Sequence, residues 1–253
     1  MKKNKVLAGI CFIAVVALIL SGVYVLRFSD GRTPPVSSSA SVSASQHEVD
    51  HYTPSVDRTN GEVMAAAVEV NEDVKGWLEI AGTDIYAPVL QADNNIFYQS
   101  HNWKGEEDTA GAYYFDSACD VRFFDLLSPN VIIYGRNTDT RGEDVGDGIN
   151  FNQLARYLDK GFFDKNQTIL LTIADFEMPY EVFSVGYIDA DTEALITKAN
   201  PTPDDFQELL ALVVSVNVFG AEVSTEGIIN IITLIAYDEE SAQHLAVFGK
   251  LAL

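Results

Sequence analysis

Few side chains in this sequence could do nucleophilic chemistry. The chain has two cysteines, and Cys11 lies within a long apolar run. Cys119 stands between Asp116 and Asp120, and nearby carboxylates raise the pKa of a thiol and disfavour the reactive thiolate. We therefore expect Cys119 to be an inert thiol. Two cysteines also exclude a disulfide framework and a cysteine-rich zinc site, and no Gly-x-Ser-x-Gly segment marks a serine nucleophile.

The other polar clusters give weak indications of a metal site. Four carboxylates in the glycine-rich segment 137–150 could bind Ca²⁺, but their spacing is not that of an EF-hand, and we expect a solvated acidic loop: Asp139, Glu143, Asp144 and Asp147. His47 and His51 stand four apart in a polar segment where a solvated linker is expected. His101, close to Trp103, is expected in a surface turn. We therefore predict no cofactor and no metal.

The charge of the chain is strongly negative and unevenly distributed. It has 16 Lys and Arg against 37 Asp and Glu, a formal net charge of −21. Residues 1–59 hold six basic and four acidic residues, so the rest of the chain carries a net charge of −23. Sequence-independent nucleic-acid binding needs Lys and Arg to replace condensed counterions, so this excess of acid argues against it.

The N-terminal part of the sequence predicts a membrane anchor and a stalk. Residues 6–26 contain no charged side chain, and a helix of that length spans the roughly 30 Å hydrocarbon core of a bilayer. Lys2, Lys3 and Lys5 precede this run, which favours a cytoplasmic N-terminus and export of the remainder. We predict a retained single-pass anchor over residues 1–28, with a cleaved signal peptide as the alternative. The Ser- and Pro-rich residues 29–60 predict a flexible stalk, and residues 61–253 a folded domain.

Short β-rich runs dominate this domain. Val63, Ala67 and Val70 form an apolar stripe that predicts a helix at its start. Thr202 as N-cap and Pro203 in the first turn predict a helix over 202–213, and a short helix is expected over 151–158. The expected strands are 83–90, 111–115, 131–134, 168–173, 180–188, 228–236 and 245–253. Seven or eight strands with few helices predict a mainly β fold, a closed or nearly closed barrel.

Three segments of the sequence resemble class B sortases. Residues 71–101, NEDVKGWLEIAGTDIYAPVLQADNNIFYQSH, resemble the opening of that family's domain. Residues 130–137, NVIIYGRN, resemble the strand that carries its Tyr-Gly-His-Asn, and residues 231–240, IITLIAYDEE, resemble the strand that ends in its Thr-Leu-Ser-Thr-Cys. Sortases are membrane-anchored cysteine transpeptidases on the outer face of Gram-positive bacteria, which cut a C-terminal sorting signal and pass the acyl group to an amine. The resemblance implies a sortase-like barrel at the cell surface.

The resemblance also implies that all three catalytic positions are substituted. Arg136 stands where the family has His, Tyr237 where it has the nucleophilic Cys, and His244 where it has Arg. A phenol with a reference pKa of about 10 is mostly protonated at pH 7, and a guanidinium cannot act as a general base. We therefore expect a pseudoenzyme that binds a sorting-signal-like peptide, an active sortase or another surface protein without cutting it.

Two alternatives remain open. Tyr237 with His244 as its base and Arg136 as the oxyanion donor would form a rewired triad in an active transpeptidase or hydrolase. Tyrosine is also larger than cysteine, so its ring could fill the cleft and leave a structural surface domain.

Overall fold

A computed structural model of the whole chain describes residues 59–123, 126–137, 151–174, 176–220, 223–237 and 241–252. The predicted anchor, the stalk up to residue 58 and the acidic segment 138–150 lie outside the described residues. Within those ranges, no helix has the length and apolarity needed to cross a bilayer. The described side chains also contain no group of three or more His, Cys, Asp or Glu that could hold a metal ion.

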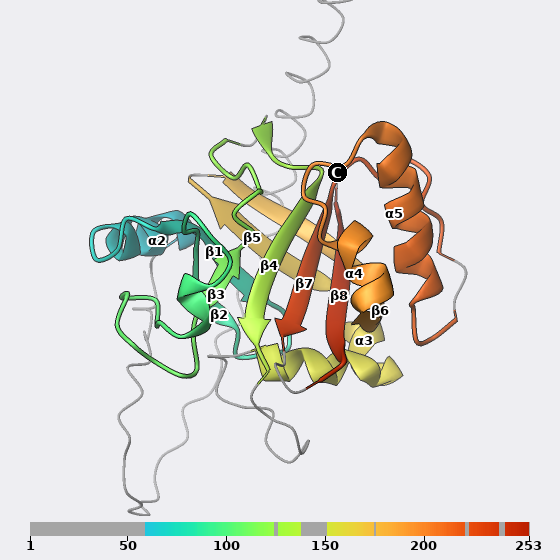
Figure 1. Cartoon of the computed structure of the whole chain (residues 1–253), viewed down its shortest axis with the longest axis horizontal. Coiled ribbons are helices and arrows are strands. Elements are labelled where there is room, and N and C mark those ends of the chain that lie inside the picture. The colour runs from blue at the N-terminus through green and yellow to red at the C-terminus, as the bar shows by residue number, and fades with distance from the viewer. Residues whose placement is uncertain are drawn as a thin grey trace, which may run out of the picture. The chain divides into compact units, whose positions relative to one another are not determined.

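The domain is a closed barrel of eight strands with a few helices (Figure 1). The order around the barrel is β1-β2-β3-β4-β7-β8-β6-β5, and pairing of β1 with β5 closes it. This confirms the predicted barrel, and each expected strand range overlaps one of its strands. The strands are β1 (Val74–Ile80), β2 (Tyr86–Leu90), β3 (Tyr113–Phe115), β4 (Asn130–Arg136), β5 (Thr168–Ile173), β6 (Phe176–Asp189), β7 (Ile231–Tyr237) and β8 (Gln243–Leu251).

Strand β1 (Val74–Ile80) was not among the strands expected from the sequence, which did not distinguish it from the helix before it. Helix α2 (Asn60–Val68) ends two residues short of Val70, whose side chain is 57% exposed, so the prediction that Val70 belongs to the buried stripe was wrong. β1 follows and buries Trp77 and Leu78 between β2 and β5. Its two sheet partners, rather than its own residues, decide that this segment is extended.

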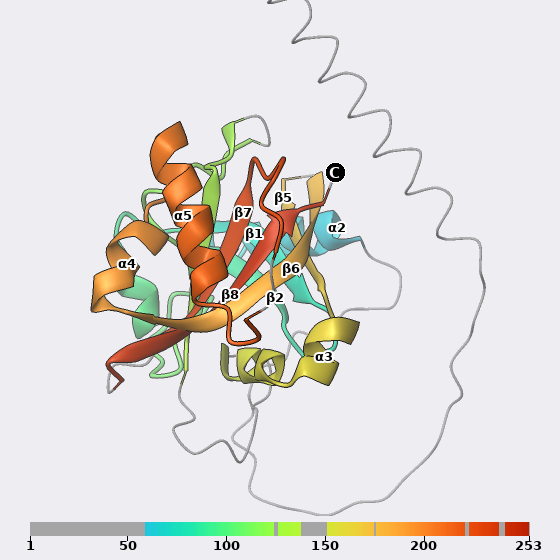
Figure 2. The ribbon, with the colours of Figure 1, turned by 90° about the vertical axis from the view of Figure 1, so that its right-hand side faces the viewer.

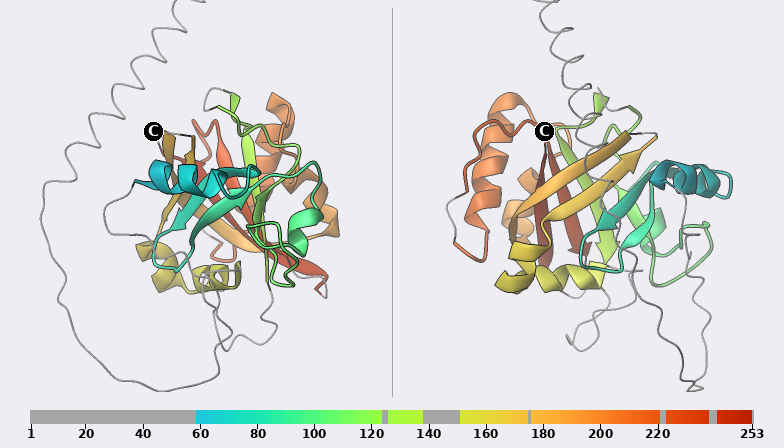
Figure 3. Two further views of the ribbon diagram at one scale, coloured as in Figure 1. Left: turned by 90° about the vertical axis from the view of Figure 1, so that its left-hand side faces the viewer. Right: turned by 180° about the vertical axis from the view of Figure 1, so that it is seen from behind.

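The helices cover the outside of the barrel. α2 lies beside β1, and α5 (Pro203–Ser215) lies on the other side, beside β6 and β8 (Figures 2 and 3). The predicted cap of α5 is confirmed, because the Oγ1 of Thr202 accepts a hydrogen bond from the amide of Asp205. The remaining helices among the described residues are η1 (Phe97–Gln99), η3 (Phe151–Leu158), α3 (Lys160–Lys165) and α4 (Ala190–Ile196).

A buried asparagine fixes the start of the two central parallel strands. Asn130, the first residue of β4, is fully buried, and its Nδ2 donates to the carbonyl oxygen of Ile196 at 2.8 Å. Its Oδ1 accepts a 2.7 Å hydrogen bond from the Oγ1 of Thr233 on β7. Because a buried amide costs free energy unless it is paired, these bonds favour one register of β4 against β7. That register decides which residues meet at the far ends of the strands.

Candidate functional site

The three positions singled out in the sequence lie side by side at one end of the barrel. Arg136 and Tyr237 are register partners at the ends of the parallel strands β4 and β7. On the next strand, the imidazole ring of His244 lies 5.0 Å from the phenol ring of Tyr237, with an interplanar angle of 39°. Tyr237 therefore stands between a guanidinium on one neighbouring strand and an imidazole on the other.

Strand alternation determines which side chains of β4 join this site. Successive side chains point to opposite faces of a strand. A Cβ on Gly135 would come within 2.7 Å of Phe151 and 2.8 Å of Tyr113, so this position faces the barrel core and has no room for a side chain. Tyr134 and Arg136, on either side of it, therefore share the opposite face.

Arg136 ties the loop between β2 and β3 to the end of β4. Its Nη1 donates to the carbonyl oxygen of Gln99 at 3.2 Å and to that of Thr109 at 3.0 Å. The two carbonyls lie on the outgoing and returning arms of the loop, whose arms are also joined by a 2.9 Å bond from the amide of Ala112 to the oxygen of Tyr98. The guanidinium thus acts as a clamp that holds this loop against Tyr237.

A small cavity lies between Arg136 and Tyr237. The cavity has a volume of about 10 Å³ and is lined by Tyr98, Gln99, Tyr114, Arg136 and Tyr237. That volume is about what one water molecule requires. In this part of the described structure, a peptide side chain would have to displace a wall of the cavity in order to enter.

The tyrosines next to this cavity are held in their protonated form. Tyr114 and Tyr134 stack with ring centroids 5.3 Å apart, and the hydroxyl of Tyr134 donates to Oδ2 of Asp116 at 3.0 Å. Burial raises the pKa of Tyr114 to about 12, and the neighbouring Tyr237 and Asp116 add to the rise. Burial and Asp116 also place the pKa of Tyr134 well above its usual range. Neither phenol is available as a base near neutral pH.

Cys119 lies away from this cavity and is shielded from solvent. The thiol is 6% exposed, and its Sγ accepts a hydrogen bond from the amide of Ile132 at 3.3 Å. Burial raises the pKa of Cys119 to about 12, and the charge of Asp116 contributes less. These features support the expected inert thiol, and burial contributes more to the raised pKa than the neighbouring carboxylates do.

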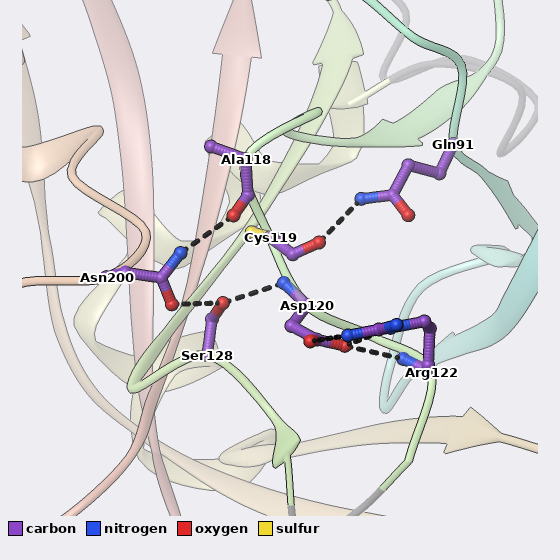
Figure 4. Close-up of polar contacts among 7 residues, drawn as sticks. All are labelled: Gln91, Ala118, Cys119, Asp120, Arg122, Ser128 and Asn200. Carbon is purple, nitrogen blue, oxygen red and sulfur yellow. Dashed lines mark hydrogen bonds and ion pairs between the residues drawn. The ribbon is translucent and has the colours of Figure 1, made fainter.

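Backbone contacts hold the loop around Cys119 in place (Figure 4). Gln91 donates through Nε2 to the carbonyl oxygen of Cys119 at 2.8 Å, and the amide of Asp120 donates to Oγ of Ser128 at 2.8 Å. The carboxylate of Asp120 pairs with Arg122 at 2.6 Å instead of facing the sulfur. The loop thus has a structural role in which the thiol is a buried apolar group.

We expect native Cys119 to resist alkylation, with a steep dependence on pH. In a Cys11→Ser chain treated with iodoacetamide at pH 8, labelling should be roughly a thousandfold slower than in urea, because the reactive thiolate is scarce. The native rate should rise about tenfold per pH unit from pH 8 to 10, whereas the denatured rate levels off above about pH 8.5. Intact-mass measurement follows the reaction, and rapid native labelling at pH 8 would contradict this account.

The remaining histidine candidate lies outside the cavity. His101 stacks on the ring of Phe97 at 4.0 Å, and its Nδ1 is 2.8 Å from the carbonyl oxygen of Phe97. It forms an isolated antiparallel bridge with Glu107 and is half-buried, so it stands beside the turn at residues 103 and 104, whereas the sequence placed it in a surface turn. His47 and His51, like the four carboxylates of segment 138–150, lie outside the described residues.

Sequence reasoning missed the loop residues that close the cavity. Tyr98 and Gln99 line it together with Arg136, which is 37 positions from Gln99. No local pattern in that segment marks it as part of a site, because its partner stands on a strand far along the chain. Tyr114, within the expected strand 111–115, also lines the cavity.

Comparison with known proteins reveals relatives of one kind. The chain is 33% identical to sortase B of Listeria monocytogenes over 198 residues, which are 76% of each chain, and 25% identical to sortase B of Staphylococcus aureus over 186 residues, 72% of each. The structure of a Staphylococcus aureus sortase B–substrate complex matches with a TM-score of 0.64 and 23% identity, covering 75% of this chain and 84% of that one. No protein-family model matches the chain.

Proposed function

This chain belongs to the sortase B family. We propose that it is a non-catalytic member of that family, whose barrel is a surface domain that contacts other proteins without cutting them. The observation that carries the proposal is the small size of the cavity between Arg136 on β4 and Tyr237 on β7. The Arg136 guanidinium is bonded to two loop carbonyls, and the volume left beside Tyr237 is about 10 Å³.

The chemistry of the three residues supports inactivity. Amide cleavage by this route needs a nucleophile that attacks the carbonyl and leaves again, together with a base that takes its proton. Tyr237 offers a phenol in place of a thiolate, and Arg136 holds its proton at any physiological pH. The described thiol, Cys119, is buried elsewhere and has a raised pKa.

We propose a location at the outer face of a cell membrane. The uncharged run 6–26, preceded by three lysines, supports a single-pass anchor with a cytoplasmic N-terminus. The remainder, with a net charge of −23, would then lie outside the cell. Such a charge keeps a domain soluble and repels anionic wall polymers.

Peptide capture is a second candidate. The Staphylococcus aureus relative has been solved with a substrate, which supports a sorting-signal-like peptide as a ligand for this scaffold. Here the peptide would have to displace the loop held by Arg136, because the described cavity does not accept a side chain. An active sortase is the alternative partner at the same face.

A rewired triad is a third candidate, favoured by one contact. The rings of Tyr237 and His244 are 5.0 Å apart, so His244 is close enough to act on the phenol after a small rotation. Arg136 would then supply the oxyanion donor, and its Nη1 is already bonded to two loop carbonyls.

One experiment separates these candidates. We expect the full chain, incubated with sorting-signal peptides and an amine acceptor, to give no cleaved or ligated product by mass spectrometry. The Tyr237→Phe chain should behave identically, and fluorescence anisotropy of labelled peptide should show no saturable binding. Saturable binding without cleavage would instead support peptide capture. An acyl adduct on Tyr237, or turnover that Tyr237→Phe abolishes, would refute inactivity.

A further inference from the structure

A second and larger cavity lies away from Tyr237, which we call the α3 pocket. It is bounded by α3, β6, β8 and the segment after α5, and its volume is about 280 Å³. Lys250, in the wall of the pocket, is the register partner of Ile231, the first residue of β7. Tyr237 is the last residue of that strand. Six residues of strand therefore separate the level of the pocket from Tyr237, a distance of about 20 Å. Its lining comprises Lys160, Phe163, Gln167, Glu181, Val182, Phe183, Asn217, Phe219, Val223, Ser224 and Lys250.

One side of the α3 pocket is apolar. The rings of Phe163 and Phe219 meet edge to face with centroids 5.2 Å apart. Val182 and Phe183 on β6 are buried and add to the apolar lining. Aromatic and aliphatic walls of this kind favour the apolar body of a ligand.

The charge of the lining is opposite to that of the domain. Lys160 and Lys250 contribute two cations, and Glu181 contributes one anion, within a folded region of net charge −23. The Nζ of Lys160 lies 5.5 Å from the centroids of both Phe163 and Phe219, so one ammonium stands directly over the aromatic wall.

The carboxylates that pair with these two lysines can be replaced by an incoming anion. Lys160 pairs with Asp164, and both side chains are about half exposed; the Nζ of Lys250 lies 3.3 Å from a carboxylate oxygen of Glu181, which is also about half exposed. Exposed pairs contribute little net free energy, so an incoming anion can replace the carboxylate at small cost.

A mostly buried asparagine adds an amide group to the lining of the α3 pocket. Asn217 is only 7% exposed and lines the pocket. Its Oδ1 accepts a long hydrogen bond of 3.4 Å from the amide of Phe219, while its Nδ2 donates to no acceptor in the described part of the chain. A ligand oxygen in the pocket would take the place of solvent as the acceptor for this amide nitrogen.

We propose that the α3 pocket binds a carboxylate carried on an aromatic or apolar body. The carboxylate accepts from Lys160, Lys250 and the Nδ2 of Asn217, while the body packs on Phe163 and Phe219. Both a small aromatic acid and the free C-terminus of a peptide that ends in an apolar residue have this chemistry. The site is independent of the function proposed for the Tyr237 end of the barrel.

The test uses a matched pair of probes on the full chain. We expect N-acetyl-phenylalanine to bind with a dissociation constant of about a millimolar, the range for a ligand of its size. The neutral N-acetyl-phenylalanine amide should bind at least tenfold more weakly, because it lacks the charge-assisted hydrogen bonds. Ligand-observed NMR titration measures both affinities. An acetylated tetrapeptide ending in phenylalanine that binds more tightly than the single residue would assign the ligand as a peptide C-terminus; equal affinity would assign a small acid.

Variants locate the binding. Lys160→Met and Lys250→Met should each lower the affinity for N-acetyl-phenylalanine about fivefold to tenfold, because each change removes one ammonium group that binds the carboxylate. Lys165→Met, on the same helix but outside the lining, is the control and should leave the affinity unchanged. Thermal melting checks that each variant is folded. Equal affinity for acid and amide, or an acid affinity that neither lining lysine alters, would overturn the proposal.

Discussion

Replacing Arg136 by His, Tyr237 by Cys and His244 by Arg is expected to produce slow cleavage of a sorting-signal peptide in a chain that we propose to be inactive. Positions 136 and 237 are register partners on β4 and β7, so the new imidazole and thiol would stand on neighbouring strand ends. The new arginine would face the thiol from β8, where His244 now contacts Tyr237.

The same three changes also open the cavity. Loss of the Arg136 guanidinium removes both hydrogen bonds that hold the loop at Gln99 and Thr109. Loss of the Tyr237 phenol removes one wall of the 10 Å³ space. Substrate access and chemistry are therefore restored together, and neither Tyr237→Cys nor Arg136→His alone should give product.

We expect only partial recovery. An error of 1 Å in positioning costs about a hundredfold in rate, and the residues around the site are packed for a phenol and a guanidinium. The measurement is peptide cleavage by chromatography, together with intact-mass detection of a thioester at position 237.

The matched control has Ala at position 237 together with the other two changes. A further chain adds Cys119→Ala to the three changes, which excludes a reaction at Cys119. Product from the alanine control, or the absence of both thioester and product from the cysteine chain, would show that the three positions do not form a site.

Alkaline pH is expected to unfold the domain through its buried acids. Burial raises the pKa of Cys119 to about 12, and it raises those of Tyr98 and Tyr114 to about 12 as well. It also shifts three further phenols upward: Tyr134, Tyr157 and Tyr180. A group whose pKa is raised by folding stabilises the fold below its unfolded pKa and loses that contribution as the pH rises toward the folded value.

The pH range follows from the unfolded values. The thiol, with an unfolded pKa of about 8.5, begins to favour unfolding above that pH, and the phenols do so above about pH 10. At pH 11 the loss is about 3 kcal/mol for the thiol and on the order of 1 kcal/mol for each phenol. The total is a large fraction of the roughly 5–15 kcal/mol that keeps a domain folded.

Urea unfolding at pH 8, 9, 10 and 11 measures this dependence. The free energy of unfolding should fall gradually to pH 10 and steeply beyond. The Cys119→Ala chain is the control, because it should lose the early part of the decline and keep the later part. Stability that stays constant up to pH 11, or an early decline that Cys119→Ala leaves intact, contradicts the assignment to these buried groups.

Much of the barrel was predictable because its strands have local signatures. The β-branched residues of 131–134 and 228–236 predict extended chain, and Thr202 with Pro203 predicts the start of a helix, from residues within a few positions of one another. β1 was missed because its extended form depends on pairing with β2 and β5. Val70 was misassigned because α2 ends before it.

The sequence by itself determined which residue types stand at positions 136, 237 and 244, and it placed each near the end of an expected strand. Only the tertiary structure decided what surrounds them: the loop carbonyls of Gln99 and Thr109 on Arg136, the closed space at Tyr237, and, on the far side of the barrel, the joining of Lys160, Asn217 and Lys250 in one pocket. The reason is physical. Strand propensity depends on near neighbours, whereas a cavity is the volume left over when segments far apart in the chain pack together.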